Sequence, residues 1–321
     1  MNKAPSWYTL RPYYSSQKRT PTMSELSFRA PRYWGVWLLI GILNGVAKLP
    51  WNVQVQSARA LGCFLLLAAK RRRKIVETNL RLCFPEWDKD EQKEKVKEVF
   101  FHNALGFIEA ANAYHSDPKS LQKRVTIRGI EHLKAAQAQG RGVLLIGAHY
   151  SHLDLGGALV SLVTPVSAIY RPNDNALMNR YIIKGRLSFM KAVIKRTDMR
   201  GIVKALKKNE VVWYPPDQDY GKEHAVYAPF FGVTAATITA TSRLVKFNKS
   251  PVVMLSYNRD NNGHYHLEFS PAPELFPSGD DHTDATLINS ALEENIRKAP
   301  TQYMWTHRRF KNQPDNKKYY Q

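Results

Sequence analysis

The chain has 321 residues, 44% of them hydrophobic, which is enough for one large core or two smaller ones and excludes disorder over most of its length. Its 47 lysines and arginines outnumber 27 aspartates and glutamates, so the formal net charge is +20. Such a surface favours nucleic acid, anionic lipid or an acidic protein as partner. Two cysteines without a C-x-x-C pair suit a reducing compartment and give no support to a disulfide framework or a cysteine-based zinc site.

The N-terminal part of the chain predicts contact with a membrane. Residues 1–32, with six basic residues and one acidic residue, favour a flexible basic segment. Residues 33–47 are uncharged, but fifteen residues fall short of the roughly 20 that a membrane span needs. Tryptophans stand where interfacial anchors would, at Trp34, Trp37 and Trp51.

A second apolar run, residues 61–69, ends at five consecutive cations, residues 70–74. Anionic headgroups attract such a block beside an apolar helix, although a nucleic-acid patch or a solvated turn has the same composition. We therefore predict membrane-associated helices over residues 33–75. Because both flanks of the first apolar run are positive, a short span and an interfacial helix both stay open.

From residue 76 to the end, the pattern predicts one domain of the α/β class. Residues 88–114 favour an amphipathic helix. Further on, short β-rich runs predict strands at 125–128, 143–148, 166–170, 211–214, 252–257 and 264–270. They alternate with predicted helices at 130–138, 152–163, 176–190, 199–208, 234–247 and 284–298. This alternation predicts a mostly parallel sheet flanked by helices.

A histidine and a carboxylate stand where the strand predicted at 143–148 ends. Five residues along one helix would separate the side chains of His149 and Asp154 by about 140°. They meet only if His149 is still extended and Asp154 lies in the first turn of the next helix. Asp154 would then hold one imidazole nitrogen while the other faces a pocket, as in a hydroxyl-activating dyad. The alternatives are a capping box from Ser151 to Asp154 and a structural histidine.

Three other segments carry candidate site residues. Arg171 follows the strand predicted at 166–170 and could clamp a phosphate or carboxylate, or pair with a neighbouring acid. Asp217 stands in the turn PPDQDYG, where two prolines and a glycine would project it. Residues 302–311 are basic and aromatic, typical either of a site or of a membrane-facing or solvated tail.

Several motifs are absent from the sequence. There is no G-x-S-x-G, Walker A, G-x-G-x-x-G or H-E-x-x-H pattern, so serine hydrolases, P-loop enzymes and thermolysin-like proteases lose support. The D-x-D at residues 217–219 could indicate a metal-dependent glycosyltransferase, but a three-residue match is weak. We predict no metal site.

Taken together, the motifs resemble those of the lysophospholipid-acyltransferase superfamily, which is marked by H-x4-D/E. Within it, the chain is similar to the late (secondary) acyltransferases of bacterial lipid A synthesis. The matching segments are RYW, KRRRKIVETNLRLCFPE, the H-x4-D, YRPNDN, IVKALKKNEVVWYPPDQDYG, PFFG and QYMWTHRRFK. Many members have glutamate where this chain has Asp154, and the superfamily uses both.

The resemblance implies transfer of a fatty acyl chain from acyl carrier protein to the 3-hydroxyl of a hydroxyacyl chain on a Kdo-bearing lipid A precursor. It implies no cofactor beyond the acyl donor. His149 would be the base and Asp154 its orienting carboxylate. The lauroyltransferase branch fits best, and the myristoyl- and palmitoleoyl-transferring relatives stay open. The implied substrate-binding residues are Arg171, Asp217, His307, Arg308 and Arg309.

The implied partners are acyl carrier protein, the lipid A precursor and anionic inner-leaflet phospholipid, and not nucleic acid. The implied location is the bacterial inner membrane, with the catalytic domain on its cytoplasmic face. Two other functions remain as alternatives: a glycerolipid enzyme such as a lysophosphatidic acid acyltransferase, and a basic, membrane-adjacent binding protein without catalysis.

Overall fold

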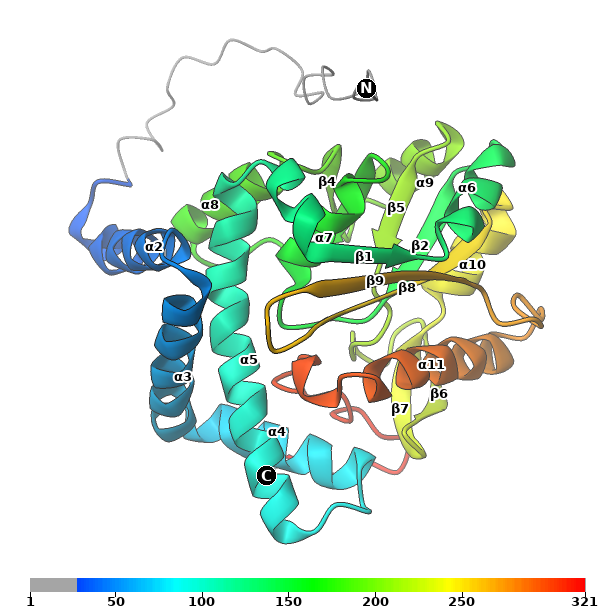
Figure 1. The fold of residues 1–321 in the computed structure, drawn as a ribbon. Coiled ribbons are helices and arrows are strands. Elements are labelled where there is room, and N and C mark those ends of the chain that lie inside the picture. The colour runs from blue at the N-terminus through cyan, green and yellow to red at the C-terminus, as the bar shows by residue number, and fades with distance from the viewer. Residues whose placement is uncertain (1–27, 321) are drawn as a thin grey trace.

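A computed structural model describes residues 28–320 of the chain (Figure 1). Most of the predicted basic N-terminal segment, residues 1–27, lies outside the described residues, as does residue 321.

A seven-stranded sheet forms the centre of the fold (Figure 1). Its strand order is β1-β9-β8-β2-β5-β3-β4, and neighbouring strands are parallel except for β8 with β9. Every residue of β2, β3 and β5 is buried, which explains their largely apolar sequences. The strands are β1 (Val125–Arg128), β2 (Val143–Gly147), β3 (Val166–Tyr170), β4 (Ala192–Lys195), β5 (Val211–Tyr214), β8 (Val252–Arg259) and β9 (Tyr265–Pro271). The predicted mostly parallel α/β class is confirmed.

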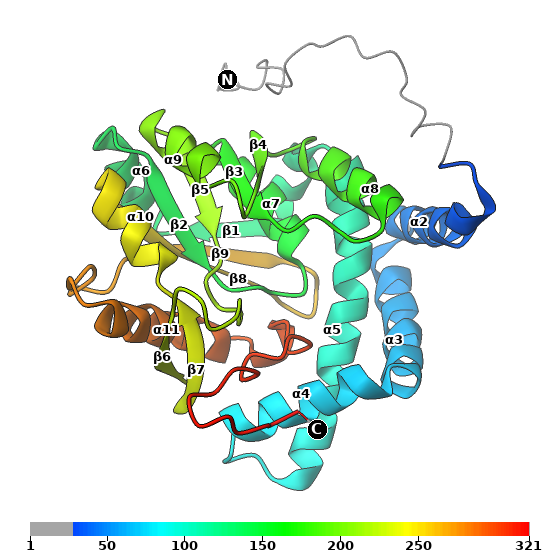
Figure 2. The ribbon, with the colours of Figure 1, turned by 180° about the vertical axis from the view of Figure 1, so that it is seen from behind.

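Helices surround this sheet (Figure 1 and Figure 2). They are α6 (Ile130–Ala138), α7 (Leu153–Ser161), α8 (Ala176–Arg186), α9 (Met199–Lys207), α10 (Ala240–Asn248) and α11 (Asp281–Arg297). The edge strand β4 was not predicted from the sequence, because four residues ending in lysine give little periodic signal.

One predicted helix begins in the wrong place. Residues 234–238 belong to β7 (Val233–Ile238), which pairs antiparallel with β6 (Ala225–Phe230) in a separate hairpin beside α11. The two residues that join the strands, Phe231 and Gly232, both have positive φ, at 52° and 71°. That backbone is the two-residue turn that matches the twist of a hairpin. The helix begins only after the hairpin, at Ala240.

The N-terminal part of the described chain forms four helices beside the sheet: α2 (Trp34–Ala47), α3 (Trp51–Ala68), α4 (Lys70–Cys83) and α5 (Lys89–His115). The long α5 lies between α3 and the sheet (Figure 1). Helix α3 buries a narrow stripe of residues four apart, Gln54, Ala58 and Gly62, against α5. The predicted boundary at residue 75 falls inside α4.

Large apolar side chains of α2 and α3 remain exposed, including Trp34, Trp37, Leu38, Ile42, Phe64 and Leu67, with 49–69% of their surface accessible. None of the helices within residues 28–320 has both the length and the hydrophobicity needed to cross a bilayer.

A buried polar network joins α5 to β8 and β9. The Glu109 carboxylate lies 2.5 Å from a guanidinium nitrogen of Arg259 and accepts a hydrogen bond from the Tyr265 hydroxyl. Arg259 also donates to His102 Nδ1 at 2.8 Å. Burial, and then the charge of Arg259, lowers the pKa of His102 to about 3, so this histidine is neutral and can accept. Glu109 and Arg259 therefore stabilise the fold only as a pair.

Replacing Glu109 should be costly. In Glu109→Ala the buried Arg259 loses its counter-charge, and we expect the free energy of unfolding to fall by about 3–5 kcal/mol. Urea unfolding in detergent, followed by tryptophan fluorescence, measures the loss. Glu268→Ala is the matched control, because it breaks the exposed pair with Lys298 and should cost less than about 1 kcal/mol. Equal, small losses in both variants would contradict a structural role for the buried pair.

Candidate active site

His149 stands just beyond the carboxyl end of β2, and Asp217 lies beyond the carboxyl end of the adjacent parallel strand β5. Because the two strands are neighbours, their ends bring these side chains together. Asp217 Oδ1 lies 2.6 Å from His149 Nδ1, and Oδ2 accepts a hydrogen bond from the His149 backbone amide at 2.9 Å. One carboxylate thus fixes both the ring and the backbone of the histidine.

Asp154 lies in the first turn of α7, as predicted, but the prediction that it would hold the imidazole is wrong. Its carboxylate accepts from Arg186 of α8, at 2.6 Å from Nε and 3.3 Å from Nη2. The alternative, a capping box from Ser151 to Asp154, is also not formed, because His152 occupies the N-cap without a side-chain hydrogen bond. The chain turns between His149 and α7, so the Asp154 side chain points to α8. Asp217 reaches the His149 ring instead, because it follows β5, the strand next to β2.

Asp217 is ionised in this arrangement. Burial alone would raise the pKa of its carboxyl, since the side chain is fully buried. The nearby charge of His149, the hydrogen bonds from that residue and a hydrogen bond from Tyr303 outweigh burial and hold the pKa below its usual value. A carboxylate against Nδ1 places the ring proton there and leaves Nε2 as the basic nitrogen. Within residues 28–320, Nε2 makes no hydrogen bond.

The loop that carries His149 is pinned from two sides. Met304 donates its backbone amide to the His149 carbonyl at 2.9 Å, and Ser151 donates to the Gln302 carbonyl at 2.8 Å. On the other side, α5 approaches closely at Gly106, where an added Cβ would lie 2.1 Å from the Ser151 carbonyl oxygen. The histidine is therefore held before any ligand arrives, which is what precise proton transfer requires.

The remaining predicted residues have different surroundings. Arg171 is exposed and pairs with Asp174 of its own loop at 3.2 Å, so the neighbouring-acid alternative holds in this structure. Arg309 is buried and donates to the Ala236 carbonyl and to Thr237 Oγ1, which ties the C-terminal segment to β7. His307 Nε2 accepts from the Asp219 amide at 3.0 Å. Arg308 of this basic run lines a cavity beside α4.

Asp219, the second carboxylate of the D-x-D, is also occupied. It accepts hydrogen bonds from the backbone and side-chain amides of Asn312 and from the Gly221 amide. Residues 28–320 hold no cluster of three or more side chains of the metal-binding types.

Two residues beside the dyad, Trp213 and Arg186, were not predicted from the sequence. The Trp213 ring meets the His149 ring edge to face, with centroids 5.8 Å apart, from the end of β5. Arg186 pairs with Asp154 and lines a small apolar cavity together with Trp213. The position of Arg186 at the end of a helix does not indicate that it pairs with Asp154. Trp213, which stands just before the PPD turn, could have been predicted to lie near the site.

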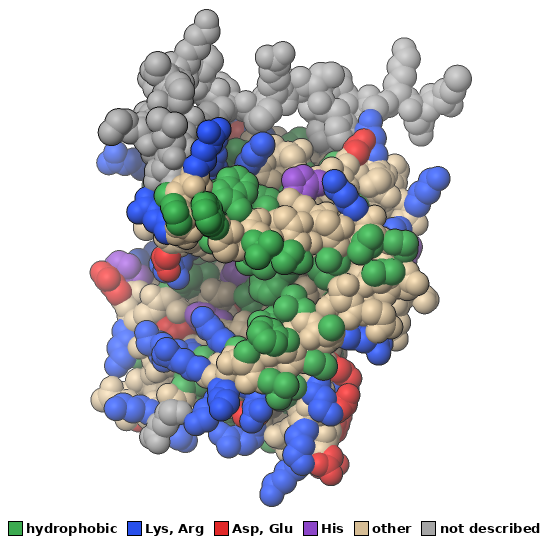
Figure 3. Space-filling model, turned by 90° about the vertical axis from the view of Figure 1, so that its left-hand side faces the viewer, with side chains coloured by type: hydrophobic (Ala, Val, Ile, Leu, Met, Phe, Trp, Pro, Cys, Tyr) green, Lys and Arg blue, Asp and Glu red, His purple; other side chains and the backbone are tan. Residues whose placement is uncertain are grey.

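Figure 3 shows the face that carries the N-terminal helices. A hollow opens there with histidine side chains inside it, hydrophobic side chains along one margin and many lysine and arginine side chains along the other. Separately, the His149–Asp217 pair offers an oriented imidazole base.

Comparison with known proteins agrees with this chemistry. The model of the family described as bacterial lipid A biosynthesis acyltransferase matches residues 22–312. The chain belongs to this family. It is therefore an acyltransferase of lipid A biosynthesis, as its motifs predicted.

Three relatives from Escherichia coli (strain K12) show the range within the family. The lipid A biosynthesis lauroyltransferase is 41% identical over 89% of this chain and 94% of its own length. The palmitoleoyltransferase is 37% identical with the same coverage. The myristoyltransferase is 28% identical over 88% of each chain.

The acyltransferase should lose stability in mild acid because of His307. Burial lowers the pKa of His307 from 6.5 to about 4. Between these values the unfolded chain binds a proton that the folded chain does not, so the free energy of unfolding falls as pH drops from about 6.5 to 4. This one group contributes up to about 3 kcal/mol of that fall.

Urea unfolding at pH 7, 5.5 and 4.5 tests the effect in wild type and His307→Gln. The variant should show a smaller pH dependence, although His102 still contributes. His282→Gln, which changes an exposed histidine on α11, is the control and should keep the wild-type dependence. The same slope in all three proteins would contradict the assignment.

Proposed function

We propose that the enzyme transfers a lauroyl chain from acyl carrier protein to the 3-hydroxyl of a hydroxyacyl chain on a Kdo-bearing lipid A precursor. The pairing of His149 with the buried carboxylate of Asp217 carries the proposal, because hydroxyl attack on a thioester requires a positioned base. The lauroyl chain is favoured by the 41% identity to a lauroyltransferase, against 37% and 28% for the palmitoleoyl- and myristoyl-transferring relatives.

In the proposed reaction, His149 Nε2 removes the proton of the acceptor hydroxyl as its oxygen attacks the thioester carbonyl. The tetrahedral intermediate then expels the carrier's thiolate, which takes the proton back from the imidazolium. Asp217 fixes the imidazole tautomer and stabilises its charged form, and a positioned base contributes about 10²–10⁴-fold. The step balances without a cofactor beyond the acyl donor.

Asp154, the carboxylate of the H-x4-D motif, takes a supporting role in this proposal. Asp154 acts through Arg186, which it holds at the wall shared with Trp213, whose ring contacts His149. The proposed partners follow from charge. Acyl carrier protein is acidic and the lipid acceptor carries phosphates and carboxylates, so both are attracted to a chain of charge +20.

The test is acyl transfer in detergent from carrier thioesters of C10 to C16 chains onto the Kdo-bearing precursor. Wild type should give most product with C12. His149→Ala should lose about 10² or more of the rate, because the base is gone. Equal rates in both proteins would refute His149 as the base, and transfer only to lysophosphatidic acid would replace the proposed acceptor with a glycerolipid.

The same assay separates the two carboxylates. Asp217→Asn keeps the shape of the side chain but loses the charge that orients the ring, so its rate should fall nearly as far as that of His149→Ala and should depend differently on pH. Asp154→Asn leaves the His149–Asp217 contact intact and should keep the wild-type pH profile, whatever its rate. The opposite pattern would restore Asp154 as the orienting residue.

We also propose that α2 and α3 lie in the interface of the bacterial inner membrane, with the catalytic domain on the cytoplasmic face, where the acyl donor is made. The exposed apolar side chains of both helices supply the insertion surface. The cations of α4 follow directly after α3, where they meet anionic headgroups of inner-leaflet phospholipid.

Charge placed on this surface should prevent binding. Trp37→Glu with Leu38→Glu puts two carboxylates on exposed positions of α2, and we expect at least tenfold weaker flotation with phosphatidylglycerol-containing vesicles. Phe247→Glu, on the exposed face of α10, is the control and should float like wild type. Unchanged flotation of the double variant would contradict the proposed surface.

A further inference from the structure

A cavity of about 510 Å³ on one side of α4 is lined by four cations, namely Lys70, Arg71, Lys74 and Arg308. Its other lining residues are Ile75, Thr78 and Tyr320, so no carboxylate faces it. Within residues 28–320, none of the four cations forms an ion pair. Four positive charges that converge on one space repel one another, and an anion in that space relieves the repulsion.

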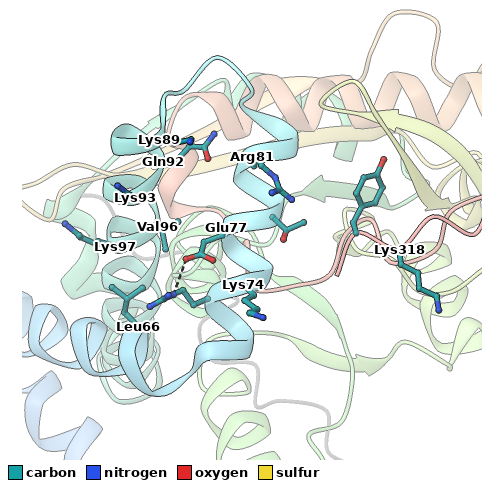
Figure 4. A pocket seen from close by; sticks show the side chains of 13 residues that line it. Leu66, Lys74, Glu77, Arg81, Lys89, Gln92, Lys93, Val96, Lys97 and Lys318 are labelled. Atoms are coloured by element: carbon teal, nitrogen blue, oxygen red, sulfur yellow. Dashed lines mark ion pairs between the residues drawn. The ribbon is translucent and has the colours of Figure 1, made fainter. Parts of the chain in front are cut away.

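A larger cavity, of about 880 Å³, lies between α4 and the start of α5 and shares Lys74 and Thr78 with the smaller one (Figure 4). It is also basic, but several of its cations already have partners. Arg73 pairs with Glu77 at 3.1 Å, Lys93 with Asp90 at 2.8 Å, and Lys97 with Glu94 at 2.9 Å. Within residues 28–320, the cations of the larger cavity without an ion pair number four, Lys74, Arg81, Lys89 and Lys318, as many as in the smaller cavity. The smaller cavity gathers its four cations in less space and has no carboxylate in its lining, so it has the higher density of uncompensated charge.

The smaller cavity is rigidly connected to the C-terminal segment. The Asn79 side chain of α4 donates to the carbonyls of Trp305 and His307 at 2.7 and 2.8 Å. Arg72 donates to the Thr306 carbonyl at 3.0 Å, and the Tyr320 hydroxyl donates to Asn79 Oδ1. These bonds lock α4, which carries three of the cations, to the segment that carries Arg308.

The same segment holds the catalytic dyad. Met304 donates to the His149 carbonyl, and the Tyr303 hydroxyl donates to the Asp217 carbonyl at 3.3 Å. Arg308 is four residues beyond Met304. An anion in the cavity would therefore lie at a fixed position relative to His149. A headgroup bound loosely on the outer surface would have no such fixed position.

The position of the smaller cavity next to the exposed apolar end of α3 also suits a lipid substrate. Phe64 and Leu67 are exposed at the end of α3, and Lys70 begins α4 three residues later. If α3 lies in the interface, the cavity is at the depth of phosphate groups, with the acyl chains of the same lipid beside α3.

We propose that this cavity binds a phosphate group of the acceptor lipid and thereby places the acceptor's hydroxyl at His149. Two arginines can each contact phosphate oxygens bidentately, and the lysines supply point charges. The inference rests on the proposed function, in which the acceptor is a phosphorylated glycolipid.

The test compares acceptors with and without phosphate. Arg71→Gln with Arg308→Gln should raise KM for the diphosphorylated acceptor about tenfold or more, with a smaller effect on kcat, because two charge-assisted contacts are lost. For an acceptor lacking the phosphate that binds here, wild type should already show the raised KM and the double variant should add little. Arg128→Gln with Arg200→Gln removes two exposed arginines elsewhere and should leave KM unchanged.

A second readout does not depend on catalysis. Equilibrium binding of the two acceptors, by thermophoresis in the same detergent without acyl donor, should show the same phosphate-dependent loss in the double variant. This loss would support the cavity even if acyl transfer failed, which separates the inference from the proposed function. Equal affinity of wild type and double variant for the diphosphorylated acceptor would overturn the inference. Weaker flotation on anionic vesicles, with an unchanged preference for phosphate, would assign the cavity to bulk phospholipid headgroups instead.

Discussion

The site depends on one buried charge. Asp217 is fully enclosed, and an ionised carboxylate in such a place is tolerated only when hydrogen-bond donors surround it. The His149 ring and backbone amide donate to the two carboxylate oxygens, and the Tyr303 hydroxyl donates to the Asp217 backbone carbonyl. The ends of β2 and β5 must therefore stay side by side, and the segment that carries Tyr303 must stay docked. The requirement that stabilises Asp217 is the same one that holds the His149 ring in place.

The sequence predicted that His149 and Asp217 follow strands, but it did not predict that the two residues contact each other. The unbroken apolar run of β2 located His149 at a strand tip, and the PPD turn located Asp217 after another strand. Strand order was not accessible, because periodicity tells which segments are strands and not which ones are neighbours. A spacing of five residues made Asp154 the obvious partner, whereas the sheet places β5 next to β2 and brings in a residue 68 positions away.

The basic C-terminal run shows a second limit of sequence patterns. Consecutive cations among aromatic residues predict an exposed or ligand-facing segment, yet Arg309 is buried with its guanidinium over the Phe230 ring. Its hydrogen bonds to β7 substitute for water. Because the residues of β7 were predicted as helix, these hydrogen bonds of Arg309 could not be predicted from the sequence. Arg308, one residue earlier, lines a cavity. Of these two neighbouring arginines, therefore, Arg309 stabilises the fold and Arg308 is available to a ligand.

Helix α5 couples the two halves of the molecule through close backbone approaches. At one contact, Gly62 of α3 lies so near that an added Cβ would be 2.9 Å from the Phe101 Cα. One and a half turns further along α5, Gly106 lies against the His149 loop. A side chain at Gly62 would push α3 away from α5, and a side chain at Gly106 would push α5 away from the His149 loop. Because both contacts are made by the single helix α5, they fix the distance between the apolar surface of α3 and the His149 loop.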